Sequence, residues 1–241
     1  TAGLRYTKDK KFFHPDQIII ANRVAFLGAP FNSPIFNPGT RVLPDVDARV
    51  NFSEVTPMVN LSYDVTDGLM TYATWSRGFK SGGFTQRVFP PIIPGVTTPI
   101  TDPVAAIPSF SPEKVDAYEL GVKFEAPDRS ITVNASAFYT DYQDLQVQVF
   151  TSVAPVFRNA ASATIKGFEL ETQLRPVRGL LLEAAAGLTD ASYDSIDQAT
   201  TFINPNNAFE RISKWTLSAA ATYDMELSGG SHLRPRVDWS W

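Results

Sequence analysis

Two neighbouring segments of this chain alternate apolar and polar residues one by one, and a short break separates them. In the first, the even positions from Phe168 to Leu174 are Phe, Leu or Thr, and the odd positions between them are Glu or Gln. In the second, every other residue from Leu180 to Leu188 is Leu or Ala. A period of two predicts strands with one buried face, and the Pro and Gly in residues 175–179 predict a turn. We therefore expect a long β-hairpin whose arms approach the roughly 9–11 residues that a tilted strand needs to cross a bilayer.

The same alternation predicts further strands on both sides of this hairpin, about nine in all. The additional strands are expected at residues 3–10, 55–63, 69–77, 115–125, 131–150, 215–223 and 232–241. Short turns (64–68, 126–129, 175–179 and 224–231) alternate with long connections (11–50, 78–112 and 193–212) and one of modest length (151–158). All the tight turns then lie at one end of the sheet. Outer-membrane barrels have this asymmetry, and a Greek-key sandwich has no reason to show it.

Aromatic residues occupy the expected apolar face near both ends of the strands. Tyr63 and Tyr223 each precede an aspartate that opens a tight turn, and Tyr118 and Trp215 are near the long-loop ends of their strands. Aromatic girdles at both edges of an apolar band are typical of membrane barrels. Strand-end tyrosines also occur in ordinary sheets, so this pattern alone leaves a soluble sheet open.

The composition excludes several classes of protein. The 241 residues include no Cys, which removes disulfides, thiol catalysis and thiolate metal sites. The formal net charge is −4, which gives no support for a nucleic-acid partner. No apolar run approaches the 18 residues of a transmembrane helix.

Motifs that could carry chemistry are weak. Residues 78–83 (GFKSGG) lack the spacing of a phosphate-binding loop, and we expect a glycine-rich bend there. His14 and His232 are far apart and have no second ligand at metal spacing. Three aspartates at 190, 194 and 197 do not fit a calcium loop, although a weak cation site there stays open. We expect no enzymatic activity, no metal site and no cofactor.

Several blocks resemble the β-barrel of TonB-dependent outer-membrane receptors. The blocks are GLRYTKDK (3–10), VTPMVNLSYDVTDGLMTYATWSRGFKSGGF (55–84), FSPEKVDAYELGVKFE (110–125), AFYTDYQDLQVQVF (137–150), NAASATIKGFELETQLRP (159–176) and GLLLEAAAGLTDASYD (179–194). The resemblance implies an all-β, antiparallel, up-and-down transmembrane barrel with long extracellular loops and short periplasmic turns. It also implies a barrel of about 22 strands, a plug inside its lumen, and energy delivered by the TonB–ExbB–ExbD complex.

The whole chain, residues 1–241, would then be part of the barrel domain of such a receptor in the Gram-negative outer membrane. No plug or TonB-contacting motif precedes Thr1, and no closing strand with a terminal aromatic is apparent. We therefore expect an internal piece of about nine of the 22 strands.

The function that the resemblance implies is uptake of a large ligand, most often a ferric siderophore. We expect the long connections to line the capture vestibule, with Arg77 and Lys80 at a loop base as cations for an anionic siderophore or for lipopolysaccharide phosphates. The same two cations could also be ordinary solvated charges. Aromatic and amide candidates for ligand contact are Phe31, Asn32, Phe36, Phe84, Phe89, Phe202, Asn204 and Asn206. Outer-membrane lipid would be a further partner.

Two readings from other classes stay open at this point. The first is a soluble β-sandwich that binds carbohydrate, in which the apolar faces form a dry core. The second is a membrane-barrel hydrolase, which requires a nucleophile–base pair, and neither histidine lies in a context that supplies the base.

Overall fold

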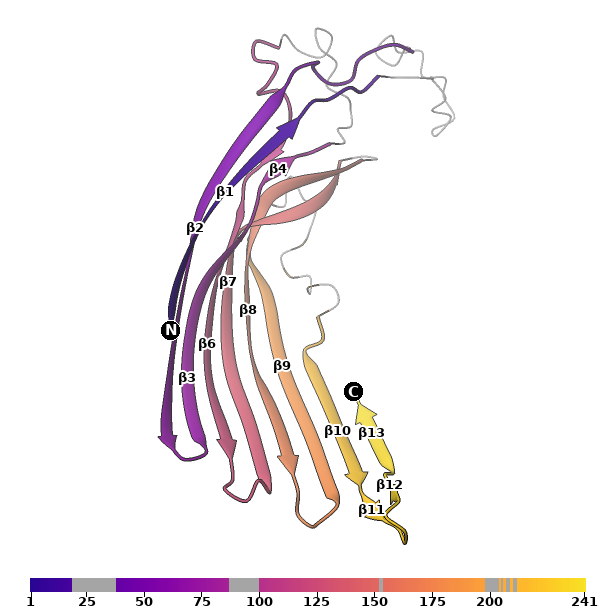
Figure 1. Cartoon of the computed structure of the whole chain (residues 1–241). Helices are drawn as coiled ribbons and strands as arrows, with labels where there is room; N and C mark the ends of the chain where they lie inside the picture. Colours follow the sequence, from indigo (N-terminus) through magenta and orange to yellow (C-terminus); the bar gives the residue numbers. More distant parts are fainter. Residues whose placement is uncertain are drawn as a thin grey trace.

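The chain folds into one large antiparallel sheet (Figure 1). The computed structural model describes residues 1–18, 38–86, 100–151, 154–197, 204, 206, 209 and 212–241. Nine strands form the sheet: β1 (Ala2–Phe13), β2 (Ala48–Thr66), β3 (Leu69–Lys80), β6 (Glu113–Glu125), β7 (Ile131–Thr151), β8 (Ala154–Leu174), β9 (Leu180–Ile196), β10 (Trp215–Tyr223) and β13 (Arg236–Ser240). Two small pairs accompany it: β4 (Gly83–Phe84) with β5 (Ser109–Phe110), and β11 (Met225–Glu226) with β12 (His232–Leu233).

The nine strands follow one another through the sheet in chain order. Each strand pairs with its neighbour in the antiparallel sense, so the sheet is an up-and-down meander. Figure 1 shows the tight turns together at the lower end, and the ends of β1 and β3 that lead into long connections at the upper end. The expected strand number and order are therefore confirmed, and the turns at 64–68, 126–129 and 175–179 share one end of the sheet.

The opposite end also has one short connection, because β7 and β8 pair as far as Thr151↔Ala154. The last strand of the sheet begins at Arg236 and not at residue 232, since His232–Leu233 pairs with β11.

The tight turns use residues that tolerate a left-handed backbone. Gly68 and Gly179 close two of them with φ of 106° and 89°. Arg129 takes φ of 58° in the third, where Asp128 accepts hydrogen bonds from the N–H and hydroxyl of Ser130. Glycine adopts this region without steric cost, and the aspartate side chain stabilises the turn locally.

Several strands extend further toward the long loops than the alternation predicts. β1 and β2 pair from Ala2↔Val59 to Phe13↔Ala48, so the connection between them is shorter than residues 11–50. The modest connection expected at 151–158 is wrong, because β7 and β8 pair as far as Thr151↔Ala154. The expected loop at 193–212 is also wrong at its start, since β9 continues to Ile196.

A small buried cluster explains why β7, β8 and β9 reach so far. Its members are Val147, Val149, Val156 and Ala161, with Leu145, Ala160, Tyr193 and Ile196 packed against them. Because these side chains come from all three extensions, their burial stabilises pairing beyond the region of regular alternation. Pro155 and the polar residues of this stretch obscured that contribution in the sequence.

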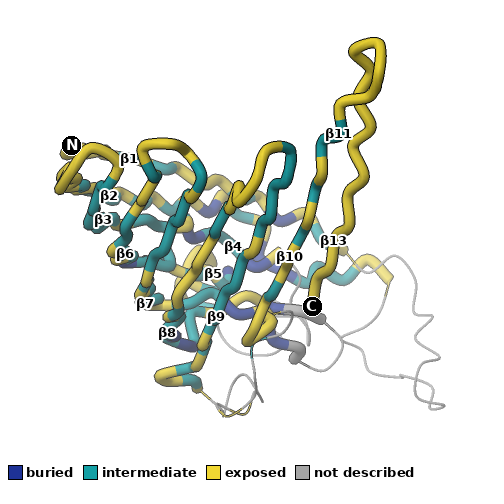
Figure 2. The backbone as a smooth tube through the Cα atoms, turned by 90° about the horizontal axis from the view of Figure 1, so that it is seen from below, coloured by how far each residue is buried: buried dark blue, intermediate teal, exposed yellow. Residues whose placement is uncertain are grey.

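The sheet is curved, and its two faces differ (Figure 2). β4 and β5 lie inside the arc, where Phe84 of β4 stacks on Phe13 of β1 with ring centroids 5.6 Å apart. Phe13 therefore faces the concave side, and alternation places Tyr6 and Leu4 on the convex side. Following the register from strand to strand gives the convex face Leu61, Ala73, Leu120, Ala137, Phe168, Leu188 and Trp215.

The convex face is apolar and uncovered. Leu61, Leu120 and Tyr63 are 67%, 65% and 70% exposed. A sandwich would cover this face with a second sheet, whereas the described residues contain one large sheet and two two-stranded pairs. The carbohydrate-binding sandwich is therefore excluded. Within the described ranges, no helix is long and apolar enough to cross a membrane.

Candidate ligand-binding face at the long-loop end

The bend after β3 is built around a glycine pair. A Cβ on Gly82 would lie 2.2 Å from the carbonyl oxygen of Phe110 and 2.6 Å from the ring of Phe52. Only glycine allows the chain to pass this close to β5, and β4 then begins at Gly83. The bend expected at residues 78–83 is narrower than predicted, because β3 continues to Lys80 and only Ser81 and Gly82 separate it from β4. Arg77 and Lys80 belong to the strand that leads into this bend.

Aromatic contacts fix the β4–β5 pair over the concave face. Phe84 stacks on Phe13, and Phe110 packs against Phe157 of β8 with ring centroids 5.6 Å apart. The Thr85 hydroxyl, which is almost fully buried, donates to the carbonyl oxygen of Phe157. The β4–β5 pair thus contacts β1 and β8, which lie on opposite sides of β3, β6 and β7 in the sheet. It therefore forms a strap across the concave side.

Two amide side chains hold the ends of the segment that carries this strap. Gln146 of β7 and Asn159 of β8 are register partners. The Gln146 amide donates to the carbonyl oxygens of Ser81 and Ser111 at 3.1 and 3.0 Å. The Asn159 amide donates to the carbonyl oxygen of Ser111 at 2.9 Å and accepts the Ser111 N–H at 2.6 Å. We call Gln146 and Asn159 the amide clamp.

A local irregularity in β7 makes room for the amide clamp. The register shifts between Tyr142 and Leu145, and Asp144 adopts φ of 55° there. The carbonyl oxygen of Asp144 accepts a second hydrogen bond from Asn159 at 2.8 Å, and Glu113 accepts the Gln146 N–H at 2.8 Å. β-bulges of this kind re-aim side chains near functional sites. Alternation could not reveal the clamp, although Asn159 opens one of the resembling blocks.

Arg77 is committed to an ion pair on the other face of the sheet. Its guanidinium donates to both carboxylate oxygens of Asp116, at 3.0 and 2.7 Å, and the Trp75 indole N–H donates to the same carboxylate at 3.2 Å. The Asp116 side chain is 8% exposed and that of Arg77 is 42% exposed. Arg77 shares the convex face with Trp75, so its expected contact with cargo stays a prediction.

The other candidate residues fall into three groups. Lys80 and Phe84 lie at the loop base beside the amide clamp. Asn204 accepts the N–H of Asn206 at 2.9 Å in the connection between β9 and β10. Phe31, Asn32, Phe36, Phe89 and Phe202 lie outside the described residues.

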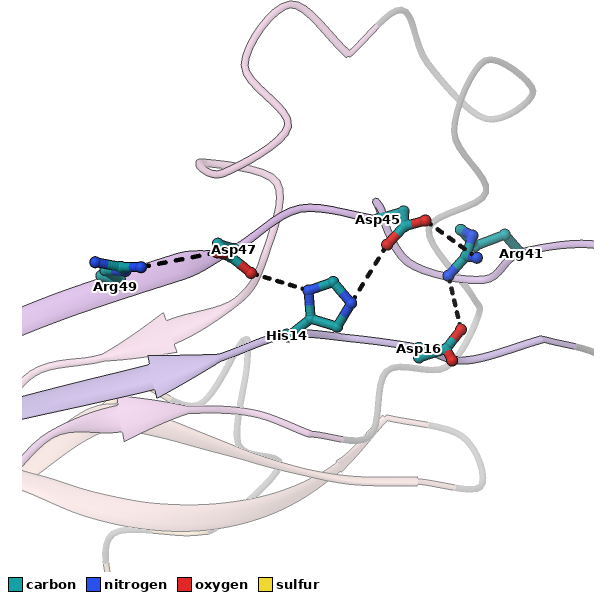
Figure 3. A network of polar contacts seen from close by, with 6 residues as sticks. All are labelled: His14, Asp16, Arg41, Asp45, Asp47 and Arg49. Carbon is teal, nitrogen blue, oxygen red and sulfur yellow. Dashed lines mark hydrogen bonds and ion pairs between the residues drawn. The ribbon is translucent and has the colours of Figure 1, made fainter.

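A polar network joins the two ends of the connection between β1 and β2 (Figure 3). His14 lies between Asp47 at 3.0 Å and Asp45 at 3.5 Å. Arg41 contacts Asp16 at 3.0 Å and Asp45 at 3.2 Å. Most of these side chains are about half exposed, so each pair contributes about 0–1 kcal/mol. The network orients the loop base. Among the described residues, no group of three metal-ligating side chains could hold an ion.

Comparison with known proteins identifies the family. The model of the TonB-dependent receptor-like β-barrel matches residues 1–241. This chain belongs to that family. Pesticin receptors of Yersinia pestis and Yersinia enterocolitica are 30% identical over 127 residues, which is 53% of this chain and 17% of theirs.

Solved receptor barrels share the fold. The ferric yersiniabactin uptake receptor FyuA of Yersinia pestis matches with a TM-score of 0.61 and 21% identity, over 80% of this chain and 26% of that one. The copper transporter OprC matches with a TM-score of 0.63 and 14% identity, over 92% of this chain and 30% of that one. The ferric preacinetobactin receptor BauA of Acinetobacter baumannii matches with a TM-score of 0.56 and 19% identity, over 82% of this chain and 26% of that one. This chain therefore spans under a third of each solved relative.

A TonB-dependent receptor barrel lies in the Gram-negative outer membrane, so the apolar convex face of the sheet is its lipid-facing side. Two aromatic levels mark the edges of that face. On β10 the edges are marked by Trp215 and Tyr223. On β1 and β2 they are marked by Tyr6 and Tyr63, and because Tyr6 pairs with Val55 the interval along β2 runs from Val55 to Tyr63. Both intervals are eight residue steps, about 27 Å of strand and about 20 Å of height after tilt. The two levels agree with an apolar band about 25 Å tall.

The concave face of the barrel is polar where it lies open. A cavity of 1180 Å³ on the turn side is lined by Asn134, Glu171, Gln173, Glu183, Arg236 and Asp238, among others. Arg236 bridges Glu183 at 2.5 Å and Asp238 at 2.8 Å. Charged groups that are paired and water-accessible are tolerated in a barrel lumen but not against lipid.

Proposed function

We propose that the protein carrying this barrel wall is a receptor that takes up a ferric siderophore with energy from TonB. The long loops capture the cargo at the outer surface. A plug lies in the lumen against the polar concave face, and the TonB–ExbB–ExbD complex acts on that plug to open a path. This chain supplies a wall and loop bases for that cycle and carries out no reaction of its own.

The single observation that carries the proposal is the strap across the concave side at the long-loop end. A loop segment that is fixed at both ends and lined with aromatic side chains can present a defined surface to a large ligand. Phe13, Phe84, Phe110 and Phe157 offer ring faces there, and Lys80 adds a cation at the rim. Such a surface suits a large, partly apolar anion.

The relatives support a siderophore as cargo. FyuA is described as an uptake receptor for ferric yersiniabactin, BauA as the receptor for ferric preacinetobactin, and FauA of Bordetella pertussis as the alcaligin receptor. OprC is described as a copper transporter. Bare-metal capture requires a cluster of ligating side chains, and the described residues contain none. We therefore favour a chelated metal, with Lys80, Phe31, Phe36, Phe84, Phe89, Phe202, Asn204 and Asn206 as candidate contacts.

The test is uptake of radioactive iron by cells that produce the intact receptor and lack their own siderophore receptors. A panel of ferric siderophores is supplied, with copper as the alternative cargo. We expect uptake of at least one ferric siderophore, and we expect it to disappear when the gene for TonB is deleted.

A second experiment deletes the loop segment 87–99 of the receptor. Its control is deletion of the tight turn 126–129. We expect the loop deletion to abolish cargo binding and the turn deletion to leave the affinity of any properly folded receptor unchanged. Iron uptake that persists without TonB, or uptake of free copper with no ferric siderophore bound, would overturn the proposal.

A further inference from the structure

The hydrogen-bonded ladder between β2 and β3 ends before either strand does. Its last pair toward the long-loop end is Met58↔Ser76, whereas β2 extends ten residues and β3 four residues beyond that pair. Over these stretches β2 stays paired with β1, and β3 stays paired with β6. Figure 1 shows β2 and β3 parting toward their upper ends. We call the gap between residues 48–57 of β2 and residues 77–80 of β3 the seam.

A proline explains where the ladder ends. The Asn60 N–H of β2 donates to the carbonyl oxygen of Thr1 at 2.8 Å, so even-numbered residues of β2 direct their backbone groups to β1 and odd-numbered ones to β3. The next pair in the register would be Pro57↔Arg77. That pair needs an N–H on residue 57, which proline lacks. The end of the pairing is therefore built into the sequence of β2.

Beyond the end of the ladder the wall becomes two layers thick. Alternation places Glu54 on the concave face of β2 and Lys114 on the convex face of β6, yet the Glu54 carboxylate lies 3.1 Å from the Lys114 amine. Opposite faces meet in this way only where the outer part of β2 lies on the convex side of β3 and β6. The even positions from 48 to 56 are accordingly buried or half-buried, and the odd positions between them are exposed.

Side chains join the two layers in place of backbone hydrogen bonds. The ion pair of Glu54 and Lys114 is one contact, and its side chains are 18% and 39% exposed. The ring of Phe52 lies against the bend at Gly82, and Phe13 of β1 stacks on Phe84 of the strap. An ion pair that is partly open to water contributes little, so the outer part of β2 is held to β3 and β6 only weakly.

A polar pocket of about 400 Å³ lies between the layers. Thr7 and Thr56 line it from the outer layer, and Gly78 and Ser81 line it from the inner one, among others. The Ser81 hydroxyl is buried and has no hydrogen-bond partner among the described residues. A polar pocket of this size holds water. Separating the two layers there exposes little dry apolar surface, so the hydrophobic cost of opening is small.

We propose that the seam is a hinge. The outer part of β2, with the strand paired to it, turns away from β3 about Pro57 when the ion pair of Glu54 and Lys114 breaks. Local opening is cheapest where few hydrogen bonds and few buried apolar contacts join two segments, and the seam has this character. Opening also withdraws Phe13 from Phe84 and so frees one side of the strap. That consequence for cargo rests on the proposed function, whereas the hinge itself does not.

The experiment measures the distance across the seam in the intact receptor, without cargo, in lipid nanodiscs. Spin labels are attached to Asn51→Cys on β2 and Gln143→Cys on β7, two exposed positions, in a receptor in which any other cysteine is replaced by serine. Double electron–electron resonance then gives the distribution of distances between the labels. Heat-modifiable migration on a gel verifies that each barrel is folded.

Two further substitutions alter the seam in opposite directions. Lys114→Gln removes the ion pair, and Pro57→Val supplies the missing N–H. Lys166→Gln is the matched control, because it breaks a convex-face ion pair with Asp190 at a place where the ladder between β8 and β9 is continuous.

We expect the unaltered receptor to show a short and a long distance. Lys114→Gln should raise the ratio of long to short about two- to fivefold, as expected for the loss of one partly exposed ion pair. Pro57→Val should leave only the short distance, and Lys166→Gln should match the unaltered receptor.

One sharp distance that is the same in every variant would overturn the proposal, as would an equal change in Lys114→Gln and Lys166→Gln. Two distances that persist in Pro57→Val would overturn the role of this proline as the hinge. Because no cargo is present, failure here leaves the uptake proposal untouched, and failure of iron uptake leaves the hinge untouched.

Discussion

Gln146 and Asn159 face each other across β7 and β8, and both donate a hydrogen bond to the carbonyl oxygen of Ser111, at 3.0 and 2.9 Å. Two neighbouring strands thus fix one point of the long connection between β3 and β6. Because Gln146 also reaches Ser81, the clamp holds both ends of that connection. The positions of Ser81 and Ser111, at the two ends of that connection, are therefore set by side chains of the barrel wall.

Replacing Asn159 by Ala should free one end of the strap. The change removes the acceptor of the Ser111 N–H and the donors to Ser111 and Asp144. Each lost hydrogen bond costs about 0.5–1.5 kcal/mol, and a donor left unsatisfied costs more. We expect the amide hydrogens of residues 109–111 to exchange more than tenfold faster in hydrogen-exchange mass spectrometry.

Asn134→Ala is the matched control, since Asn134 lies on the concave face of β7 near the tight turns. It should leave exchange in residues 109–111 unchanged. Equal protection in Asn159→Ala and in the unaltered receptor would show that the clamp does not hold the loop.

Gly82→Ala should displace β4. The new Cβ would lie 2.2 Å from a backbone oxygen, which cannot move without breaking the β4–β5 pair. The Thr85 N–H bonds to the carbonyl oxygen of Pro108 at 2.9 Å, so its exchange rate reports on the displacement. We expect faster exchange at Thr85. Gly3→Ala is the control, because nothing lies within 4 Å of a Cβ there. Identical exchange in the two variants would contradict the packing described.

Arg77→Ala should lower the free energy of unfolding more than removal of an exposed cation does. It leaves the Asp116 carboxylate, 8% exposed, without its bidentate partner. Because Arg77 itself is partly exposed, we expect a loss of about 1–3 kcal/mol in urea unfolding from lipid vesicles. Arg129→Ala breaks a contact of 3.5 Å with Glu125 in which both side chains are exposed, and it should cost less than about 1 kcal/mol. Equal losses would show that the Arg77–Asp116 pair is no stronger than a surface pair.

The turn after β10 should loosen in acid. The Asp224 carboxylate accepts hydrogen bonds from His232 at 2.8 Å and Arg234 at 3.0 Å, and His232 first and then Arg234 hold the pKa of Asp224 below its usual range. A lowered pKa in the folded state means that the stabilisation is complete above the unfolded pKa of about 3.9 and is lost as the pH falls through the folded value.

We therefore expect protection of the Leu227 N–H, which bonds to Ser231 at 2.7 Å, to be constant from pH 5 upward after correction for intrinsic exchange and to fall below about pH 4. Asp224→Asn should remove this dependence. A transition that persists in the variant would assign it to another group.

Alternation predicted the strands wherever one face meets lipid and the other meets the lumen. Phe168 to Leu174 shows this plainly, because each apolar side chain of that run faces outward. Beyond the aromatic level both faces of a strand meet water or loops, and the period of two disappears. The extensions of β8 back to Ala154 and of β9 to Ile196 were missed for that reason.

The candidate site was less accessible to sequence reasoning. Residues 78–83 predicted a bend, which the structure confines to Ser81 and Gly82 because β3 continues to Lys80. The partner of Arg77 and the target of Asn159 depend on neighbours 39 and 48 residues away along the chain, which no local pattern encodes. The register between strands supplies those pairings.

The most direct measurement of the central claim is spin-label accessibility along β8 in the intact receptor in its membrane. Residues 1–241 contain no cysteine, so single cysteines from position 168 to position 174 can be labelled one at a time in a receptor in which any cysteine outside this range is replaced by serine. We expect labels at 168, 170, 172 and 174 to be accessible to oxygen dissolved in lipid, and labels at 169, 171 and 173 to a water-soluble relaxation agent. Uniform exposure of all seven positions to water would contradict the placement of this sheet in the barrel wall.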